Sequence, residues 1–425
     1  MKIIKGFEAA KSALSRQAPR ELIGGDEREQ AVRDIISDVA QRGDEAVRYY
    51  TRKFDGVVPK TWEVDREQIV KAHDKIAPDL LEALELAAKR IRIFHTRQRE
   101  SLWSGDAEGM SWMVHPLKRV GIYVPHGTAP YPSSLLMTAI PAKVAGVKEV
   151  IMATPPGKIP PVIMAAADIA GVDRIFSIGG AQAIAAMALG TESIPSVDKV
   201  CGPGNIYVTL AKKLLYGVVG IDGLYGPSEV LIIADNTANP AYCATDLLAQ
   251  AEHGTLSAAI LVTTSKSLAS KVNHEIQQQL EKLPRREITL ESLEKNGLIA
   301  VVDTIDESIK LANLYAPEHV LLMMEGAKSY VDRLTNVGCI VAGEMATVAI
   351  GDYVAGPSHV LPTEGTARFS SPLNVIDFIK IINVVTVNQD NLEELGEAAS
   401  TLARAEGFEA HAEAIRKRLA KRDSK

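Results

Sequence analysis

Short apolar runs alternate with longer amphipathic or small-residue segments through most of the chain. A short apolar run bounded by turn residues is typical of a buried strand, and a longer segment with helical periodicity predicts a helix. The strand-like runs are 120–124, 149–153, 174–178, 198–201, 229–234, 258–262 and 298–302. The helix-like segments are 135–145, 162–170, 181–189, 206–215, 241–252, 265–283 and 307–314. Because the two kinds alternate, the pattern predicts βαβ units around mostly parallel sheets.

The alternation pauses at the turn-rich stretch Gly226-Pro227-Ser228 and then resumes. We therefore predict an α/β fold with two similar Rossmann-like domains, one inserted in the other, and small helical segments at both ends. The predicted parts are an N-terminal segment at 1–20, one α/β domain formed by 21–118 and 229–375, an inserted α/β domain at 119–228, and a C-terminal helical segment at 376–425. The charged, Ala-rich helices of the last part need a surface to pack on, in the same chain or in a partner subunit.

The composition argues against several classes of protein. The chain has 425 residues, which is enough for two or more domains, and its 46% hydrophobic and 24% charged residues are ordinary for a globular protein. A net charge of −6, from 47 basic and 53 acidic residues, argues against a general nucleic-acid binder. No apolar run reaches membrane-spanning length, and the first residues lack the apolar core of a secretory signal, so we expect a cytoplasmic protein. Cys201, Cys243 and Cys339 show no CxxC spacing and are expected to be buried, reduced thiols.

The dipeptide Glu318-His319 is the most informative candidate for catalysis. Pro317 should end the helix predicted at 307–314, which would place the pair on a constrained connection. An imidazole titrates near neutral pH and can accept a proton from an alcohol, while a neighbouring carboxylate can activate water. The competing interpretation is a surface glutamate beside a structural histidine, and the dipeptide alone favours it.

Two further segments carry side chains that suit a metal ion. Gln250 and His253 lie three residues apart at the end of a predicted helix and therefore share one face, although a histidine there is more often a capping group. Asp352 and His359 lie in a Gly/Pro-rich loop, and both are residue types that bind zinc, although Asp352 could equally stabilise a turn. His411, on a charged helix, would not be selected on its own.

Three features of the segment 119–228 suit a nucleotide, although the dinucleotide fingerprint GxGxxG is absent. The stretch Gly202-Pro-Gly-Asn205 follows a strand and opens a helix, where backbone amides can bind phosphate. Gln182 follows Gly179-Gly180 in the same way, and Tyr123 ends a strand where its ring could stack on a nicotinamide or adenine. Simple turn residues and ordinary packing explain each feature equally well, but all three fall where α/β sheets bind ligands.

Taken together, these motifs resemble the histidinol dehydrogenase family. The resemblance extends from about residue 20 to 418, and motifs in this order over this length are highly specific. It is carried by Tyr123-Val-Pro with Gly127-Thr-Ala, Gly179-Gly-Ala-Gln182-Ala, Gly202-Pro-Gly-Asn205, Gly226-Pro-Ser228-Glu, Gln250-Ala-Glu-His253-Gly, Ala316-Pro-Glu318-His319, Gly351-Asp352-Tyr with His359-Val-Leu-Pro-Thr, and Glu406-Gly-Phe-Glu-Ala-His411.

The resemblance implies a role for each matching position. It implies one Zn²⁺ per subunit bound by Gln250, His253, Asp352 and His411. It implies NAD as the cofactor, contacted by Tyr123, Gln182 and Asn205 of an NAD-binding domain at 119–228. It implies substrate contacts at Ser228, His359 and Glu406, in addition to the zinc ligands and His319. The parts 21–118 and 229–375 would then form the substrate and zinc domain.

The resemblance also implies a reaction and an assembly. L-Histidinol would be oxidised to L-histidine through the aldehyde, with His319 as the general base and Glu318 as the group that activates water for the second step. The family forms homodimers in which the C-terminal segment, here 376–425, crosses to the partner. Glu406 and His411 would then complete the active site of the other subunit.

The chain departs from the family pattern at three places: His126, Tyr225 and the stretch Ile381-Ile382-Asn383. The first two lie near the expected cofactor and substrate walls, where they could be neutral variation. They could also mark a paralogue that oxidises another small alcohol, such as a sulfonated diol, by the same chemistry. A third alternative is a member that binds a ligand without catalysis, but every expected catalytic and ligand position is present.

Overall fold

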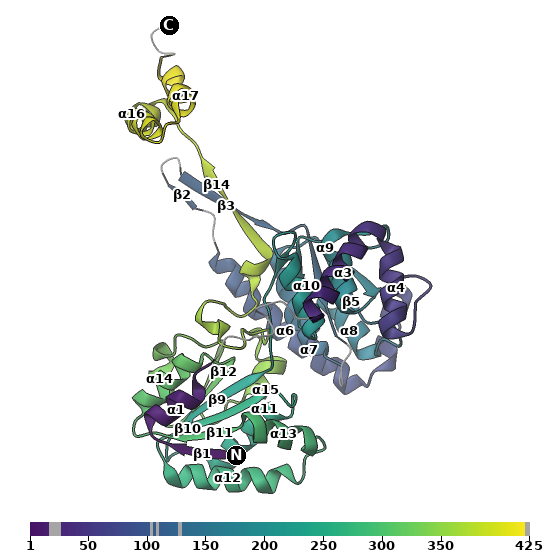
Figure 1. Ribbon diagram of the computed structural model, residues 1–425, viewed down its shortest axis with the longest axis vertical. Helices are drawn as coiled ribbons and strands as arrows, with labels where there is room; N and C mark the ends of the chain where they lie inside the picture. The colour runs from purple at the N-terminus through teal and green to yellow at the C-terminus, as the bar shows by residue number, and fades with distance from the viewer. Residues whose placement is uncertain (17–26, 103–104, 108–109, 126–129, 421–425) are drawn as a thin grey trace. The chain divides into compact units, whose positions relative to one another are not determined.

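The computed structural model describes residues 1–16, 27–102, 105–107, 110–125 and 130–420 (Figure 1). The chain forms two compact units. The first unit contains Met1–Arg99 and Leu117–Phe378, and the second contains Glu100–Pro116 and Ile379–Lys425.

The first unit contains a six-stranded, entirely parallel sheet. In spatial order its strands are β1 (Lys2–Lys5), β11 (Leu298–Val301), β10 (Ala258–Thr263), β9 (Glu229–Ala234), β12 (His319–Met323) and β13 (Cys339–Ala342). One face is covered by α11 (Pro240–Ala251), α12 (Lys266–Leu280) and α13 (Arg286–Asn296), and the other by α1 (Phe7–Leu14) and α14 (Ile305–Tyr315). Successive residues of β9 enter opposite cores, Val230 and Ile232 on one face, Leu231 and Ile233 on the other. This two-sided burial explains why β9 is a continuous apolar run.

The first unit also contains a five-stranded parallel sheet. Its order is β6 (Arg174–Ser177), β5 (Glu149–Thr154), β4 (Arg119–Tyr123), β7 (Lys199–Cys201) and β8 (Gly220–Ile221). The helices that follow its strands are α7 (Pro132–Ala145), α8 (Pro161–Ala170), α9 (Gly180–Leu189) and α10 (Ile206–Leu215). The predicted α/β class with mostly parallel sheets is therefore confirmed.

The helices α3 (Glu27–Arg42) and α4 (Asp44–Asp55) pack on helices of the five-stranded part, α3 on α9 and α10 and α4 on α9. Val32, Ile35 and Val39 of α3 share one core with residues of α9 and α10. This packing differs from the predicted grouping of 21–118 with 229–375. An amphipathic pattern shows that a helix buries one face, but it does not identify the sheet that receives that face.

Several shorter elements and one long helix complete the first unit. They are α5 (Arg66–Val70), η1 (His73–Lys75), α6 (Pro78–Ser101, whose last residues belong to the second unit), η2 (Ala327–Arg333), α15 (Val348–Ile350), the π-helical turn η3 (Gly351–Ala355), η4 (Thr366–Arg368) and η5 (Val375–Phe378). Cys201 and Cys243 are buried as predicted, whereas Cys339 is only half-buried.

The second unit combines an antiparallel sheet with a helical pair. The sheet has the order β14 (Ile379–Val385), β3 (Met110–Pro116) and β2 (Gly105–Ala107), and α16 (Gln389–Ala405) packs on α17 (Glu409–Leu419). The paired helices after residue 388 match the sequence prediction. Within the predicted helical segment 376–425 the chain also forms the strand β14, which pairs with a segment more than 250 residues earlier in the chain. A local pattern contains no information about such a distant partner.

A buried ion pair fixes the turn between β7 and α10. The side chains of Lys212 and Asp222 are 2% and 0% exposed. Lys212 Nζ donates to Asp222 Oδ1 at 2.5 Å and to the Gly202 carbonyl at 3.0 Å, while Asp222 Oδ2 accepts from Gly202 N at 2.7 Å. The pair therefore holds both polar groups of the Gly202 backbone.

Replacing Lys212 by methionine should destabilise the first unit strongly, because it leaves the buried Asp222 carboxylate without its counter-charge. We expect a loss of about 3–5 kcal/mol, measured by urea unfolding followed by tryptophan fluorescence. Lys213→Met is the matched control, since Lys213 is half-buried and pairs with Glu29 near the surface. Equal unfolding midpoints for the two variants would contradict the assignment.

Candidate active site

A cavity of about 470 Å³ lies in the first unit, and both sheets contribute to its wall. From the six-stranded part come residues that precede strands: Ser228 before β9, Ser257 before β10 and Glu318 before β12. From the five-stranded part come residues that follow strands, such as Pro125 after β4 and Pro203 after β7. The carboxyl ends of strands, where α/β sheets generally bind ligands, therefore face the cavity only from the five-stranded sheet.

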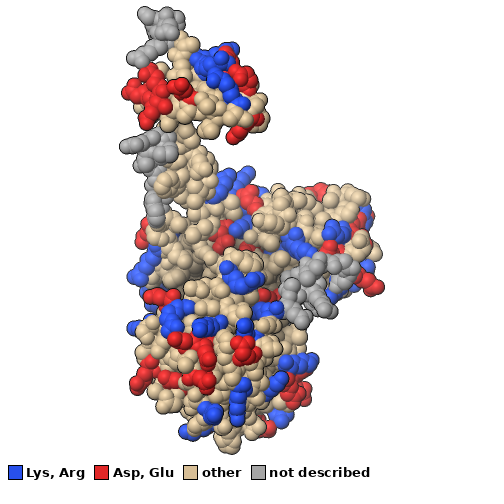
Figure 2. Space-filling model, turned by 60° about the vertical axis from the view of Figure 1, so that its left-hand side comes forward, with Lys and Arg blue, Asp and Glu red and all other residues tan. Residues whose placement is uncertain are grey.

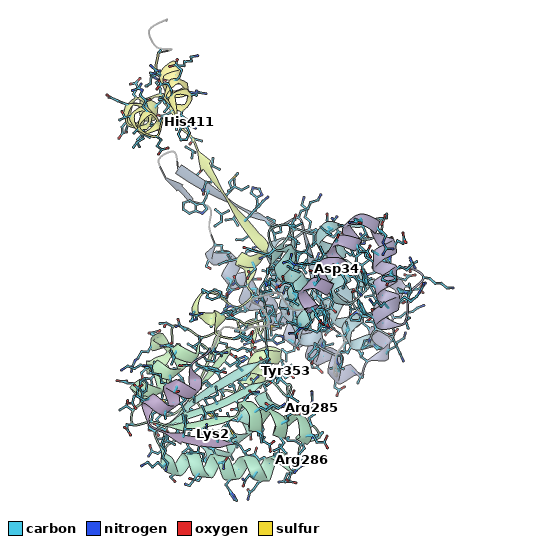
Figure 3. The ribbon with its side chains drawn as sticks, in the orientation of Figure 1. Lys2, Asp34, Arg285, Arg286, Tyr353 and His411 are labelled. Carbon is cyan, nitrogen blue, oxygen red and sulfur yellow. The ribbon has the colours of Figure 1, made fainter. Side chains whose placement is uncertain are left out.

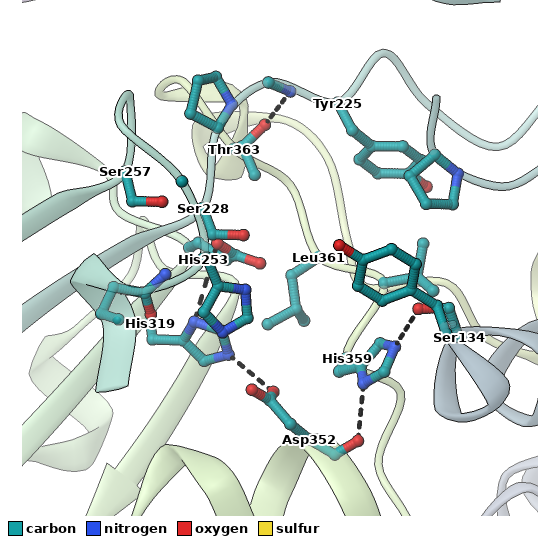
Figure 4. A pocket seen from close by; sticks show the side chains of 18 of the residues that line it. Ser134, Tyr225, Ser228, His253, Ser257, His319, Asp352, His359, Leu361 and Thr363 are labelled. Atoms are coloured by element: carbon teal, nitrogen blue, oxygen red, sulfur yellow. Dashed lines mark hydrogen bonds and ion pairs between the residues drawn. The ribbon is translucent and has the colours of Figure 1, made fainter. Parts of the chain in front are cut away.

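Seven of the predicted site residues line this cavity. They are Ser228, Gln250, His253, Glu318, His319, Asp352 and His359. Figure 4 shows the side chains of His253, His319 and Asp352 pointing toward one another. These residues come from the end of α11, the start of β12 and the turn η3, so the fold joins segments that are far apart in the sequence.

Glu318 and His319 are 6% and 4% exposed and lie at the start of β12. Glu318 is on the predicted connection after α14, but His319 is already the first residue of the strand. Glu318 Oε2 accepts from Glu229 N at 2.8 Å, and His319 Nδ1 lies 3.4 Å from the Glu229 carbonyl oxygen. On its other side His319 Nε2 lies 3.6 Å from Asp352 Oδ1. The backbone of Glu229 and the Asp352 carboxylate therefore fix the pair.

Burial raises the pKa of Glu318 to about 7, against the opposing charge of His319 and the Glu229 N–H. Burial alone would lower the pKa of His319, but the charge of Glu318 and the hydrogen bond with Asp352 outweigh it and raise that pKa. A carboxyl group with a pKa near 7 can both accept and release a proton at neutral pH, as general acid–base catalysis requires.

Gln250, His253 and Asp352 offer a donor set that fits a metal ion. His253 is exposed in the single chain, but the protein around it desolvates the ring enough to lower its pKa, which favours the neutral imidazole that coordinates a metal. Gln250 is 4% exposed, and its side chain contributes to the wall of the cavity. Burial opposes the ionisation of Asp352, but the hydrogen bond with His319 and the charge of that ring outweigh it and lower the pKa of Asp352. An amide oxygen, a neutral imidazole and a carboxylate suit Zn²⁺.

Within the described ranges, no three His, Cys, Asp or Glu side chains are close enough together to hold a metal ion. The predicted ligand set therefore stays a prediction. Its three members from the first unit include an amide side chain, and the fourth, His411, belongs to the second unit.

His359 connects the turn η3 to the start of α7. Its Nδ1 lies 2.7 Å from the Asp352 carbonyl oxygen, and its Nε2 lies 3.1 Å from Ser134 Oγ (Figure 4). Because a carbonyl oxygen only accepts, Nδ1 must carry a proton, and in the neutral ring Nε2 accepts from the Ser134 hydroxyl. Burial lowers the pKa of His359 and favours this neutral form. The sequence analysis missed Ser134, which no motif distinguishes from other helix-start serines.

The three residues predicted to contact NAD lie at the same end of the five-stranded sheet. Tyr123, 4% exposed, accepts a hydrogen bond from Gly180 N at 3.0 Å through its hydroxyl. Gln182 is 1% exposed, and neither atom of its amide has a partner among the described residues. Asn205 caps α10 by accepting from the backbone amides that follow it. Their cofactor role stays a prediction.

Gly202 lies where only glycine fits. It has φ +109°, and a Cβ there would lie 2.2 Å from the Tyr123 carbonyl oxygen. The turn can therefore approach β4 closely.

Tyr225, one of the departures from the family pattern, lines the cavity and hydrogen-bonds to Asp222. It therefore lies between the cavity and the buried ion pair. His126 lies outside the described residues.

Glu406 and His411 lie in the second unit. Glu406 follows the last residue of α16, and His411 lies in the first turn of α17 with its ring centroid 5.2 Å from that of Phe408 (Figure 3). Both are exposed in the single chain. The prediction that they complete the site of a partner subunit stays a prediction.

The surface carries charges of both signs. On the face of the first unit that Figure 2 shows, basic and acidic side chains are interspersed. In the part of the chain that the structure describes, no helix combines the length and apolarity needed to span a membrane.

Comparison with known proteins gives a consistent result. The sequence model of the family described as histidinol dehydrogenase matches residues 19–419. Histidinol dehydrogenase of Dehalococcoides mccartyi (strain CBDB1) is 55% identical over 438 residues, covering 99% of this chain and 100% of the relative. The enzyme of that name from Bacillus cereus (strain ATCC 14579) is 48% identical over 396 residues, covering 92% of each chain. The crystal structure of histidinol dehydrogenase from Elizabethkingia anophelis matches with a TM-score of 0.94 at 36% identity, covering 100% of this chain and 99% of that one.

Proposed function

The chain belongs to the histidinol dehydrogenase family, and we propose that it oxidises L-histidinol to L-histidine in two NAD-linked steps through the aldehyde, the last steps of histidine biosynthesis. The observation that carries the proposal is the buried pair Glu318-His319, which shares one cavity with Gln250, His253 and Asp352. Most of the predicted catalytic, substrate and ligand positions of the first unit thus meet at one place.

His319 acts as the general base for the alcohol. Its Nε2 faces Asp352 and the cavity, while its Nδ1 is directed toward the Glu229 carbonyl. The contact of Nδ1 with the Glu229 carbonyl orients the ring, so that Nε2 is the nitrogen that accepts the substrate proton. His319 removes the hydroxyl proton as a hydride leaves the adjacent carbon for the cofactor.

Glu318 serves the second oxidation. Its carboxylate accepts a hydrogen bond from Glu229 N at one oxygen, which leaves the rest of the group available to a water molecule. With a pKa of about 7, it can remove a proton from water as that water adds to the aldehyde carbon. The hydrated aldehyde then loses its second hydride to a second NAD, and His319 again accepts the hydroxyl proton.

The metal and the cofactor have separate places in this proposal. Gln250, His253 and Asp352, with His411 of a second subunit, would hold Zn²⁺, which when bound binds the imidazole and amine of the substrate and fixes its pose. NAD would lie against Tyr123, Gln182 and Asn205 and accept the hydride in each step. The homodimer with shared sites and the cytoplasmic location belong to the same proposal.

The purified protein should form about two NADH for each L-histidinol consumed, as the two-step reaction requires. Activity should disappear after chelation and return with Zn²⁺, because the substrate is no longer held in one pose. Absorbance at the NADH band measures both effects. Full activity without metal would exclude the zinc assignment, and turnover of another small alcohol in place of histidinol would favour the paralogue.

Single replacements should separate the two proton transfers. His319→Asn should slow alcohol oxidation by about 100- to 10,000-fold, the usual contribution of a general base, whereas Glu318→Gln should slow mainly oxidation of the added aldehyde. Stopped-flow recording of NADH with each substrate measures the two steps. Glu325→Gln, an exposed glutamate beyond the other end of β12, is the matched control and should react normally. Unchanged aldehyde oxidation by Glu318→Gln would remove its assigned role.

A shared site predicts complementation between two inactive variants. Glu318→Gln and His411→Ala chains, co-expressed with different tags and purified as mixed dimers, should regain activity, because one of the two sites would contain only intact residues. Each variant alone should stay defective. Mixed dimers as inactive as the parents would mean that His411 serves its own chain or no site at all.

A further inference from the structure

Arg16, just after helix α1, makes three strong hydrogen bonds in the first unit. Its Nη1 and Nη2 donate to the two carboxylate oxygens of Glu229 at 2.6 and 2.7 Å, and its Nε donates to the Tyr315 carbonyl at 2.6 Å. The guanidinium also lies 3.7 Å from the centre of the Tyr315 ring. Such a two-pronged pair with a 5% exposed carboxylate is geometrically specific, and a lysine cannot reproduce it.

Arg16 binds the Glu229 carboxylate and the Tyr315 carbonyl, and both residues are close to the catalytic pair. Glu229 donates its backbone N–H to Glu318 Oε2, and its carbonyl oxygen faces His319 Nδ1. The side chain of Glu229 thus contacts Arg16, while its backbone contacts Glu318 and His319. A shift of Glu229 would move the partners of both catalytic side chains together.

Tyr315 begins the turn that carries Glu318 into the cavity. Ala316, the next residue, has φ +50° and ψ +63°, a left-handed conformation that is unfavourable for a residue with a Cβ. Such a conformation persists only where its surroundings enforce it. Here Ala316 N donates to the Ala312 carbonyl at 2.8 Å, and Arg16 fixes the carbonyl on the other side of the same peptide. Pro317 and Glu318 follow immediately.

We infer that Arg16 is a positioning residue for the reaction: it clamps the start of β9 to the α14–β12 turn and so sets the orientation of Glu318 and His319. The inference rests on the proposed function for its kinetic consequences. Arg16 is separated from the catalytic pair by about 300 residues of sequence, and its hydrogen bonds go to Glu229 and Tyr315. Its effect is transmitted by two backbone segments that meet at the pair.

Arg16→Ala should lower kcat by about 10- to 100-fold while changing the KM for histidinol much less, because misplaced reacting groups slow chemistry more than they weaken binding. Oxidation of added aldehyde should be slowed as well, since Glu318 loses its orientation. In a Glu318→Gln background, the same change should slow aldehyde oxidation far less than in the wild type, because the two residues act through one group.

Two comparisons separate positioning from general damage to the fold. Arg333→Ala is the matched control, since Arg333 also pairs with a carboxylate, Asp306, and lies over a tyrosine ring, Tyr330, but at the surface. It should leave kcat unchanged. Millimolar guanidinium should restore part of the activity of Arg16→Ala, whereas sodium chloride at equal concentration should not. Arg16→Lys should fall between wild type and Arg16→Ala.

Crystal structures of wild type and Arg16→Lys provide a test that needs no turnover. We expect the Tyr315–Glu318 turn to move and the bond between Glu229 N and Glu318 to lengthen. An unmoved turn together with an unchanged kcat would overturn the inference. If the wild-type protein fails to oxidise histidinol, the proposed function fails, and the crystal comparison alone decides the role of Arg16.

Discussion

The parallel pairing of β12 with β9 is the constraint on which the site depends. This pairing sets His319 opposite Val230, so Glu229 lies beside the catalytic pair and gives its N–H to Glu318 and its carbonyl to His319. A slip of one residue would turn His319 to the opposite face of the sheet. Such a slip is prevented by the rest of β12, whose alternating side chains fill two different cores. Packing far from the cavity therefore fixes the position of the catalytic side chains.

Two buried carboxylates and one half-buried carboxylate around this register are handled in three different ways. The Glu229 carboxylate accepts two hydrogen bonds from Arg16, which balances its charge, and its role is structural. Asp352 lies beside His319, whose hydrogen bond and charge lower its pKa, so it stays ionised as a metal ligand must. Glu318 Oε2 lies 3.9 Å from Nδ1 of the adjacent His319, and burial raises the pKa of Glu318 to about 7. Different surroundings thus give chemically identical groups different tasks.

The residues that the sequence analysis missed share one property: their role comes from a contact and not from a motif. Arg16 is one of many arginines, Ser134 opens one helix among several, and Glu229 stands inside a quoted motif without an assigned role. The same limit applies to whole elements. β14 pairs with a strand more than 250 residues away, and α3 packs on α9 and α10, which its own amphipathic pattern does not identify. Sequence periodicity reports which face is buried, whereas the partner depends on the three-dimensional path of the chain.

The sequence by itself determined the α/β class, the positions of most strands and helices, and the identity of the family, because short-range periodicity and ordered motifs are local properties. It also identified Glu318 and His319 as a possible acid–base pair. Only the tertiary structure decided that the pair is buried, which of its atoms are already bonded, and that Glu318 titrates near neutral pH. Those properties depend on burial and on contacts between β9, β12, η3 and the segment after α1, and segments so far apart in sequence become neighbours only when the chain folds.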